Sequence, residues 1–327
     1  MMDTRSNEVG VIGLGLMGCS IVAALVMRGY KVIALAPQES DMERAPDRIL
    51  HALQESYKQG IHTHEVSTLK LNVLYTRNYA DLGDCFLISE CVVENIDIKK
   101  TVYALIESFV SKQAIITTNT SAIPITILQE TVTHPKRFMG MHWAEPAFTT
   151  PFLEITCGPQ TDIQLAEILY DIASSWGKEP TLLRKDIRGF ITNRLMYAMF
   201  REGFNLVENG YASIEDVDRA CRNDAGHWMT FCGLFRYMDI TGLQAYHHVI
   251  KDLFPTLSNQ KETPELIQLI ANKGGNGISN GFGFYHYSKE ESAEWEKAFE
   301  EFSYDINTLS RKYPIDLIQQ RLNKKVN

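Results

Sequence analysis

Short apolar runs alternate with helix-length segments in the first part of the chain. Residues 9–13, 31–36, 85–89, 114–118 and 138–141 have the length and composition of buried strands, and segments with helical periodicity separate most of them. Strands that alternate with helices are typical of a parallel sheet wrapped by helices. The pattern therefore predicts an α/β fold, with an N-terminal Rossmann-type doubly wound parallel sheet.

A polar, helix-rich stretch follows the second of these strands. Residues 41–79 are expected to form an inserted helical hairpin, with helices at 52–59 and 66–74 and a turn at 60–65 between them. Such a hairpin would either overhang the ligand cleft or form a solvated edge. The pattern alone does not decide between these two interpretations.

The character of the chain becomes helical after residue 157. Helical patterns at 162–176, 188–208 and 214–222, with apolar stretches to about residue 270, predict an all-helical C-terminal domain. The segment 185–189 resembles a hinge. We therefore expect three parts: a dinucleotide-binding domain at 1–186, a helical substrate and dimerisation domain at 187–287, and an amphipathic C-terminal extension at 288–327.

Composition narrows the possible partners. A net charge of −8 without a basic cluster argues against nucleic acid. No apolar run reaches the roughly 18 to 20 residues of a membrane span, and the polar start does not resemble a leader peptide. The sequence thus predicts a cytoplasmic protein with a small-molecule substrate, bound to neither nucleic acid nor membrane.

The cysteines do not predict a metal site. They stand at positions 19, 85, 91, 157, 221 and 232, without a Cys-x-x-Cys pair. Zinc sites of Cys and His have short, recognisable ligand spacings. We expect reduced thiols and assign no metal.

The turn after the first strand has the dinucleotide-binding pattern G-x-G-x-x-G. Its residues are Gly13, Leu14, Gly15, Leu16, Met17 and Gly18. The glycines allow a tight turn and a close approach of the backbone to a pyrophosphate, while the N-terminus of the following helix offers free N–H groups. Because the pattern lies between a strand and a helix, it predicts dinucleotide binding.

The position that usually selects NAD departs from this pattern. An acidic residue is expected at the end of the second strand, where it accepts hydrogen bonds from the adenosine ribose, but Ala36 stands there. Gln38 or Glu39 could reach the ribose instead, and Arg44 could meet a 2′-phosphate. We predict NAD as the cofactor, with NADP left open.

A histidine follows the predicted strand at 138–141. Ligands of parallel sheets bind at the carboxyl ends of strands, which places His142, together with Glu90, Glu94 and residues 119–121, at the cleft. A histidine can both accept and give a proton near neutral pH, and a carboxylate such as Glu154 would orient the ring. The stretch 140–154 is therefore the candidate for acid/base chemistry.

Together these motifs resemble the L-3-hydroxyacyl-CoA dehydrogenase family, in particular 3-hydroxybutyryl-CoA dehydrogenases, over roughly residues 8–287. The family's motifs occur in the same order and at similar spacing: the glycine-rich turn, 90–99 (ECVVENIDIK), 119–121 (NTS), His142 with Pro146 and Glu154, 189–195 (GFITNRL), 233–235 with 239–243, and 281–285 (GFGFY). The series is far more specific than any one of its members.

The resemblance implies roles for individual residues. His142 matches the family's catalytic histidine, and Glu154 the glutamate that hydrogen-bonds it. Further matched positions are Ser121 and Asn193 for the substrate, and Glu94, Lys99, Asn119, Ser121 and Glu145 around the nicotinamide half of the cofactor. The family also implies a homodimer and an acyl-CoA substrate.

Three departures from the family's pattern keep the substrate open. Besides Ala36, Arg188 replaces a proline at the hinge, and Glu145 replaces an asparagine near the nicotinamide. The first expectation is an NAD-dependent interconversion of L-3-hydroxyacyl-CoA and 3-oxoacyl-CoA. The carboxylate of Glu145 could attract a cationic group, which favours as an alternative a non-CoA hydroxy acid, as in carnitine or gulonate dehydrogenases.

An alternative of another class is a non-catalytic cofactor-binding or structural protein on the same fold, as a lens crystallin is. A scaffold needs none of His142, Glu154, Ser121 and Asn193, and their joint presence argues against it.

Overall fold

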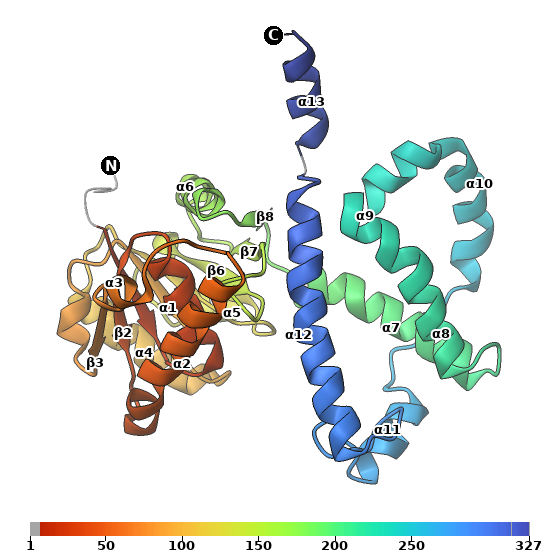
Figure 1. Cartoon of the computed structure of the whole chain (residues 1–327), viewed down its shortest axis with the longest axis horizontal. Coiled ribbons are helices and arrows are strands. Elements are labelled where there is room, and N and C mark those ends of the chain that lie inside the picture. Colours follow the sequence, from red (N-terminus) through yellow and green to blue (C-terminus); the bar gives the residue numbers. More distant parts are fainter. Residues whose placement is uncertain (1–6, 315, 327) are drawn as a thin grey trace. The chain divides into compact units, whose positions relative to one another are not determined.

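The structure, a computed structural model, describes residues 7–314 and 316–326 (Figure 1). Most of the polar start, for which no leader is expected, lies outside the described residues. The chain divides into two compact units, of which the first ends at Thr192 and the second begins at Asn193. The sequence analysis had placed the domain boundary between residues 186 and 187. Among the described residues, none of the helices combines the length and apolar character of a membrane span.

The first unit is built on an eight-stranded sheet in the order β3-β2-β1-β4-β5-β6-β7-β8. The strands are β1 (Glu8–Ile12), β2 (Lys31–Leu35), β3 (Val73–Thr76), β4 (Leu87–Glu90), β5 (Ile115–Thr118), β6 (Phe138–Trp143), β7 (Phe152–Cys157) and β8 (Glu179–Leu183). All neighbouring strands are parallel except β6 and β7, which are antiparallel. The carboxyl ends of β1 to β6 therefore share one edge of the sheet.

Helices cover both faces of this sheet, which confirms the predicted doubly wound fold. They are α1 (Leu16–Val26), α2 (Glu39–Lys58), α3 (Val66–Lys70), α4 (Ile96–Phe109), α5 (Ile125–Gln129) and α6 (Ile163–Ser175), with short 3₁₀ turns η1 (Tyr79–Leu82) and η2 (Pro135–Arg137). Residues of α1, α2 and α6 belong to one buried cluster, and residues of α4 and α5 belong to another. Each cluster also contains strand residues, because successive side chains of a strand point to opposite faces.

Three strands differ from the sequence expectation. The predicted helix at 66–74 is wrong in its second half, because Val73–Thr76 forms β3 and pairs in parallel with β2. The stretch 41–79 is thus mainly the crossover from β2 to β3, with Ala45, Ile49 and Leu53 of α2 in the core. Strands β7 and β8 were not expected from the sequence.

The second unit is helical, as predicted. Its elements are α7 (Thr192–Glu208), α8 (Ile214–Ala220), a π-helical turn η3 (Cys221–Ala225), α9 (Gly226–Thr241), α10 (Leu243–Leu253), η4 (Phe254–Thr256), α11 (Glu265–Asn272), α12 (Lys289–Arg311) and α13 (Leu317–Val326). Helix α9 is broken at Gly233, which has φ +68°. None of the residues of this unit whose side chains are described is buried.

Candidate functional site

The turn between β1 and α1 needs two of its three glycines for steric reasons. Gly13 has φ +91°, and a Cβ there would lie 2.8 Å from the backbone of Cys91. A Cβ on Gly18 would lie 1.8 Å from the carbonyl oxygen of Gly13. Both side chains are thus excluded by backbone atoms. The turn can keep this shape only with glycine at these positions.

The third glycine has no such neighbour. A Cβ on Gly15 would meet nothing within 4 Å, and Gly15 is the N-cap of α1 without a side-chain capping bond. Open space in front of an uncapped helix N-terminus is what a pyrophosphate requires. Leu14 is buried below the turn, and Leu16 and Met17 open the helix. The predicted dinucleotide-binding residues therefore fit that group.

The candidate acid/base pair lies on the antiparallel strands. His142 in β6 is directly opposite Glu154 in β7, and Nδ1 of the imidazole is 3.5 Å from Oε2 of the carboxylate. The His142 side chain is 17% exposed and that of Glu154 1%. The imidazole packs edge-on against Phe152, with ring centroids 5.5 Å apart. One ring nitrogen therefore faces a buried carboxylate, while the ring itself remains partly accessible.

Backbone groups hold the other oxygen of Glu154. Oε1 accepts hydrogen bonds from the N–H of Ile191 at 2.9 Å and from that of Thr192 at 3.4 Å. The preceding Phe190 is buried against the imidazole and has φ +52°, an uncommon value for a residue with a side chain. The sequence analysis did not predict these donors. The sequence signal for an unusual turn was the glycine that begins the motif at 189–193. In the structure Gly189 has φ +82°.

A second buried carboxylate, Glu90, organises the end of β4. It accepts hydrogen bonds from Nζ of Lys99 at 2.8 and 3.0 Å, and from the hydroxyls of Tyr103 and Thr118 at 2.8 Å each. Burial, with a smaller effect of Glu90, raises the pKa of Tyr103 well above its ordinary value, so the phenol stays a donor. Lys99 is fully buried, and Oε2 of Glu94 lies 3.5 Å from its Nζ. The ammonium thus connects two carboxylates.

Glu94 in turn holds the loop after β5. Its Oε1 accepts hydrogen bonds from the Thr120 hydroxyl and from the backbone N–H of Ser121 and Ala122. The side chain of Asn119 accepts a hydrogen bond from the N–H of Trp143 at 2.8 Å, which ties the end of β5 to the end of β6. The structure therefore gathers four predicted residues, Glu94, Lys99, Asn119 and Ser121, at the carboxyl edge of the sheet.

Glu145 lies in the loop between β6 and β7, beside α1. It occupies an exposed position, yet partial burial of its carboxyl raises the pKa, and a hydrogen bond from the Ser20 hydroxyl opposes this effect. The same hydroxyl oxygen of Ser20 accepts a hydrogen bond from the N–H of Ala147 at 2.7 Å. The loop that follows His142 is thus bound to the helix of the glycine-rich turn. The remaining predicted residue, Asn193, belongs to the second unit, in the first turn of α7.

Comparison with protein families gives a match over most of the chain. The model described as 3-hydroxyacyl-CoA dehydrogenase, NAD binding domain, matches residues 8–187. The model described as 3-hydroxyacyl-CoA dehydrogenase, C-terminal domain, matches residues 189–287. Helices α12 and α13 follow the matched segment.

Two curated relatives are similar over nearly the whole chain. The 5-formyl-3-hydroxy-2-methylpyridine 4-carboxylate 5-dehydrogenase of Mesorhizobium japonicum is 31% identical, over 88% of this chain and 92% of that protein. A protein of Deinococcus radiodurans described as a probable 3-hydroxybutyryl-CoA dehydrogenase is 30% identical, over 86% and 100%.

Two solved structures are similar to this chain in fold over most of its length. The structure of a 5-formyl-3-hydroxy-2-methylpyridine 4-carboxylic acid 5-dehydrogenase, described as an NAD⁺-dependent dismutase, has a TM-score of 0.86 at 29% identity and covers 94% of this chain and 100% of that one. The (S)-3-hydroxybutyryl-CoA dehydrogenase of Ralstonia eutropha has a TM-score of 0.73 at 26% identity and covers 86% and 99%.

Proposed function

Because the chain belongs to the 3-hydroxyacyl-CoA dehydrogenase family, whose cofactor is NAD, we propose that it interconverts a hydroxyl and a carbonyl group with His142 as the acid/base residue. One observation carries this assignment: a partly accessible histidine lies directly opposite a buried carboxylate, in the same unit as a turn that fits a dinucleotide. Ser121 and Asn193 are proposed to contact the substrate.

The environment of His142 suits proton transfer. Its Nδ1 faces Glu154, so Nε2 is the nitrogen available to a substrate hydroxyl. When Nε2 takes the proton, the imidazolium that forms is stabilised by the Glu154 carboxylate, which two backbone N–H groups fix in place. NAD, when bound, supplies the acceptor for the hydride that leaves the carbinol carbon. In the reverse direction His142 returns the proton to the carbonyl oxygen.

The proposed cofactor contacts follow the edge of the sheet. Residues 13–18 would hold the pyrophosphate through backbone N–H groups. Glu94, Lys99, Asn119, Ser121 and Glu145 would surround the nicotinamide half. Since Lys99 is buried between Glu90 and Glu94, its part is to position Glu94 rather than to meet the cofactor as a free charge.

The first substrate candidate is an L-3-hydroxyacyl-CoA, converted to the 3-oxoacyl-CoA. The family models that match both halves of the chain support it, as does the similarity to the Deinococcus protein.

The second candidate is a small carboxylate-bearing hydroxy or aldehyde compound without CoA. It is supported by the Mesorhizobium relative, whose name gives a pyridine carboxylate as substrate, and by the higher TM-score of 0.86 for the pyridine dehydrogenase structure. A carboxylate at Glu145 would also suit a protonated ring nitrogen.

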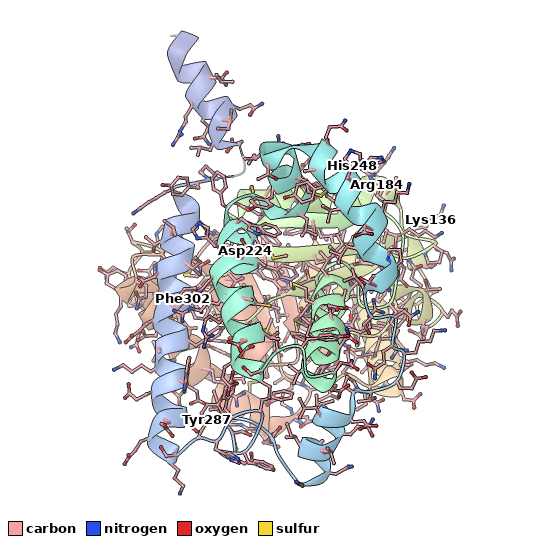
Figure 2. All side chains as sticks on the ribbon, turned by 90° about the vertical axis from the view of Figure 1, so that its right-hand side faces the viewer. Lys136, Arg184, Asp224, His248, Tyr287 and Phe302 are labelled. Atoms are coloured by element: carbon pink, nitrogen blue, oxygen red, sulfur yellow. The ribbon has the colours of Figure 1, made fainter. Side chains whose placement is uncertain are left out.

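A homodimer is proposed as the working form. The second unit contains no buried residue among those whose side chains are described, although many of its large apolar side chains are exposed. Trp295, Phe299 and Phe302 of α12 recur at helical spacing; Phe302 is labelled in Figure 2. A helical domain of this size needs a buried apolar core, which a second copy would complete.

Steady-state kinetics separate the two substrate classes. Acetoacetyl-CoA and longer 3-oxoacyl-CoA esters are compared with small 3-oxo acids and aromatic aldehyde carboxylates, with NADH consumption or NAD⁺ reduction as the readout. A higher kcat/KM for the thioesters supports the first candidate. No turnover of any CoA ester would refute it in favour of the second.

Variants of the pair test the chemistry itself. His142→Ala should lower kcat by about 10³-fold while NADH binding persists, because the loss of a general base costs typically 10²- to 10⁴-fold. Glu154→Gln should lower kcat with KM little changed, since it removes only the charge behind the imidazole. His51→Ala, an exposed histidine of α2, is the matched control. Unchanged kcat in His142→Ala would remove that residue from its assigned role.

A further inference from the structure

The end of β2 does not provide a polar group for an adenosine ribose. Ala36, at the position where an acidic residue is expected, is fully buried in the core, and its N–H donates to the carbonyl oxygen of Thr76. Rossmann folds bind the adenosine half of a dinucleotide beyond the carboxyl ends of these strands, and the ribose hydroxyls need an acceptor there. Another residue must therefore supply it.

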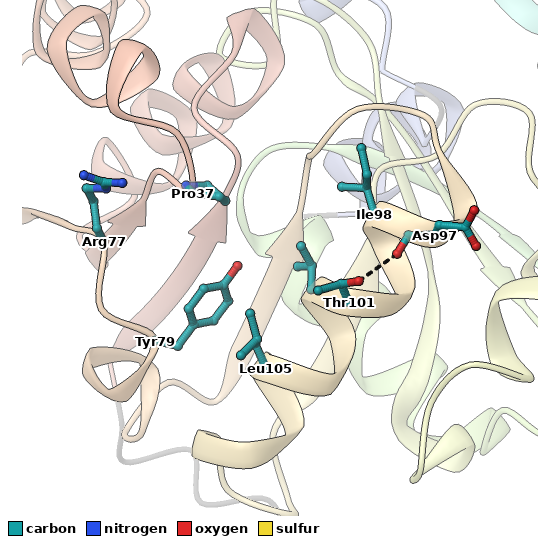
Figure 3. Close-up of a pocket in the computed structure, with 8 residues that line it drawn as sticks. Pro37, Arg77, Tyr79, Asp97, Ile98, Thr101 and Leu105 are labelled. Atoms are coloured by element: carbon teal, nitrogen blue, oxygen red, sulfur yellow. Dashed lines mark hydrogen bonds between the residues drawn. The ribbon is translucent and has the colours of Figure 1, made fainter.

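A pocket lies at this place in the first unit. It has a volume of about 710 Å³ and lies between Pro37, Arg77 and Tyr79 on one side and α4 on the other, where Ile98, Thr101 and Leu105 line it (Figure 3). Pro37 follows β2 and Arg77 follows β3, so both stand at the carboxyl ends of the strands. Its size lies within the usual range of ligand pockets, and its mainly apolar sides suit a planar base.

Arg77 at this pocket is held by a carboxylate. Its Nη1 donates a hydrogen bond to Oε2 of Glu39, the first residue of α2, over 3.4 Å. Glu39 comes three positions after Ala36. Both side chains are exposed, so the pair contributes little to stability. Because Arg77 lines the pocket, the pair can instead affect what binds there.

The two arginines of α2 are already engaged. Nη2 of Arg44 lies 3.6 Å from Asp41, and its Nε donates to the carbonyl oxygen of Ser40. Nη1 of Arg48 donates to the carbonyl oxygen of Leu14 at 3.4 Å. Asp97 adds a further carboxylate at the pocket. The charges described around the pocket are thus balanced or negative, which disfavours a 2′-phosphate with its charge of about −1.5 to −2 at neutral pH, as for other phosphate monoesters.

We infer that the Glu39–Arg77 pair determines which dinucleotide this protein prefers. Glu39 replaces the missing acid as the acceptor for the ribose 2′-hydroxyl, and by pairing with Arg77 it also withholds that guanidinium from a 2′-phosphate. The inference rests on the adenosine half lying at this edge, as the proposed function has it. It adds a residue pair that acts on selectivity and not on the chemical step.

Fluorescence titration with NADH and NADPH tests this inference without turnover. The wild type should bind NADH more tightly than NADPH. Glu39→Gln keeps the shape of the side chain but frees Arg77, and should weaken NADH while strengthening NADPH about tenfold, a factor expected for one charge-assisted hydrogen bond. The double variant Glu39→Gln with Arg77→Gln should lose the gain in NADPH affinity.

Glu55→Gln is the matched control, because it removes one charge from the other end of the same helix and frees Lys58 there. It should leave the ratio of the two affinities unchanged. An equal ratio of the two affinities in Glu39→Gln and Glu55→Gln would overturn the inference, as would a gain in NADPH affinity that persists without Arg77. Since the titration measures binding alone, failure of the proposed substrates would leave its result intact.

Discussion

Each glycine in the turn after β1 has its own reason to lack a side chain. At Gly18 the reason is internal to the protein, because backbone atoms of Gly13 occupy the space. At Gly15 the space is open, and the proposed reason is the pyrophosphate of the cofactor. These two positions therefore separate folding from binding.

Alanine at each of these positions should give opposite results. Gly18→Ala should lower the free energy of unfolding by about 3 kcal/mol, because the added Cβ overpacks against backbone. Gly15→Ala should change it by less than about 1 kcal/mol but weaken NADH binding at least about tenfold, since the methyl group enters the space of the phosphates. Urea unfolding and fluorescence titration measure the two effects. NADH binding of wild-type strength in Gly15→Ala would contradict the assignment of the open space.

At the scale of elements, a buried lysine joins β8 to the loop after His142. Lys178, just before β8, donates to the carbonyl oxygens of Ala147 and Thr150, and its Nζ lies 5.0 Å from the ring centroid of Trp143. Burial, with a smaller effect of the Arg28 charge, lowers the pKa of Lys178 to about 7. The ammonium that positions this loop is therefore close to titration at neutral pH.

The lowered pKa predicts a pH dependence of stability with a definite sign. Between about pH 7 and 10.5 the unfolded chain keeps the proton that the folded chain releases, so Lys178 makes stability rise with pH across this window. Lys178→Met should remove this contribution. Urea unfolding at several pH values from 6.5 to about 10 is compared with that of Lys58→Met, an exposed lysine. If Lys178→Met has the slope of the control, the pKa of this lysine is not lowered in the folded protein.

The ion pair between β4 and α4 predicts strong coupling. Glu90→Gln should cost about 3 to 5 kcal/mol of unfolding free energy, because it leaves the Lys99 ammonium buried without its main counter-charge. Adding Lys99→Met should restore much of this loss. Equilibrium unfolding of the two single variants and the double variant gives the coupling energy. Additive losses would show that the two side chains act independently.

The apolar pattern predicted some strands of the sheet and not others. The central strands β1, β2, β4, β5 and β6 were expected from their apolar runs, whereas both edge strands, β3 and β8, were missed. Short apolar runs are ambiguous between strand and helix. In addition, Pro180 within β8 argues against a strand, although an edge strand tolerates it.

The site was predictable in part for a similar reason. The resemblance identified His142 and Glu154 as the candidate pair. That they lie directly opposite each other follows from the pairing of β6 with β7, a strand that the apolar pattern did not predict. The backbone donors at Ile191 and Thr192 leave no residue-type signature, because any residue except proline offers an N–H. Glu90 was predicted at the cleft but not as a buried carboxylate, since its burial depends on partners in α4 and β5.

At the scale of the whole molecule, the second unit predicts self-association. Phe235 of α9 is 82% exposed, in a unit without buried residues among those whose side chains are described. Phe235→Glu should convert the proposed dimer to a monomer or strongly weaken it, because a carboxylate is costly to bury in an apolar interface. Leu71→Glu is the control, since Leu71 is 85% exposed but belongs to the first unit. Light scattering after size-exclusion chromatography measures the mass. A monomeric wild type would refute the dimer.

The segment 186–192 is hydrogen-bonded to the sheet-containing unit on both sides of the boundary between the two matched family segments. The side chain of Asp186 accepts hydrogen bonds from the N–H and hydroxyl of Thr126 at 2.7 Å each, and the N–H groups of Ile191 and Thr192 bind Glu154. The match to the NAD-binding domain ends at residue 187. A gene fusion or domain exchange made at that boundary would transfer both His142 and Glu154. The turn whose N–H groups hold the Glu154 carboxylate would then come from the other protein. In this chain the structural unit around the catalytic candidates therefore extends beyond the matched segment, and we expect an exchange point after Thr192 to preserve the contacts of Glu154.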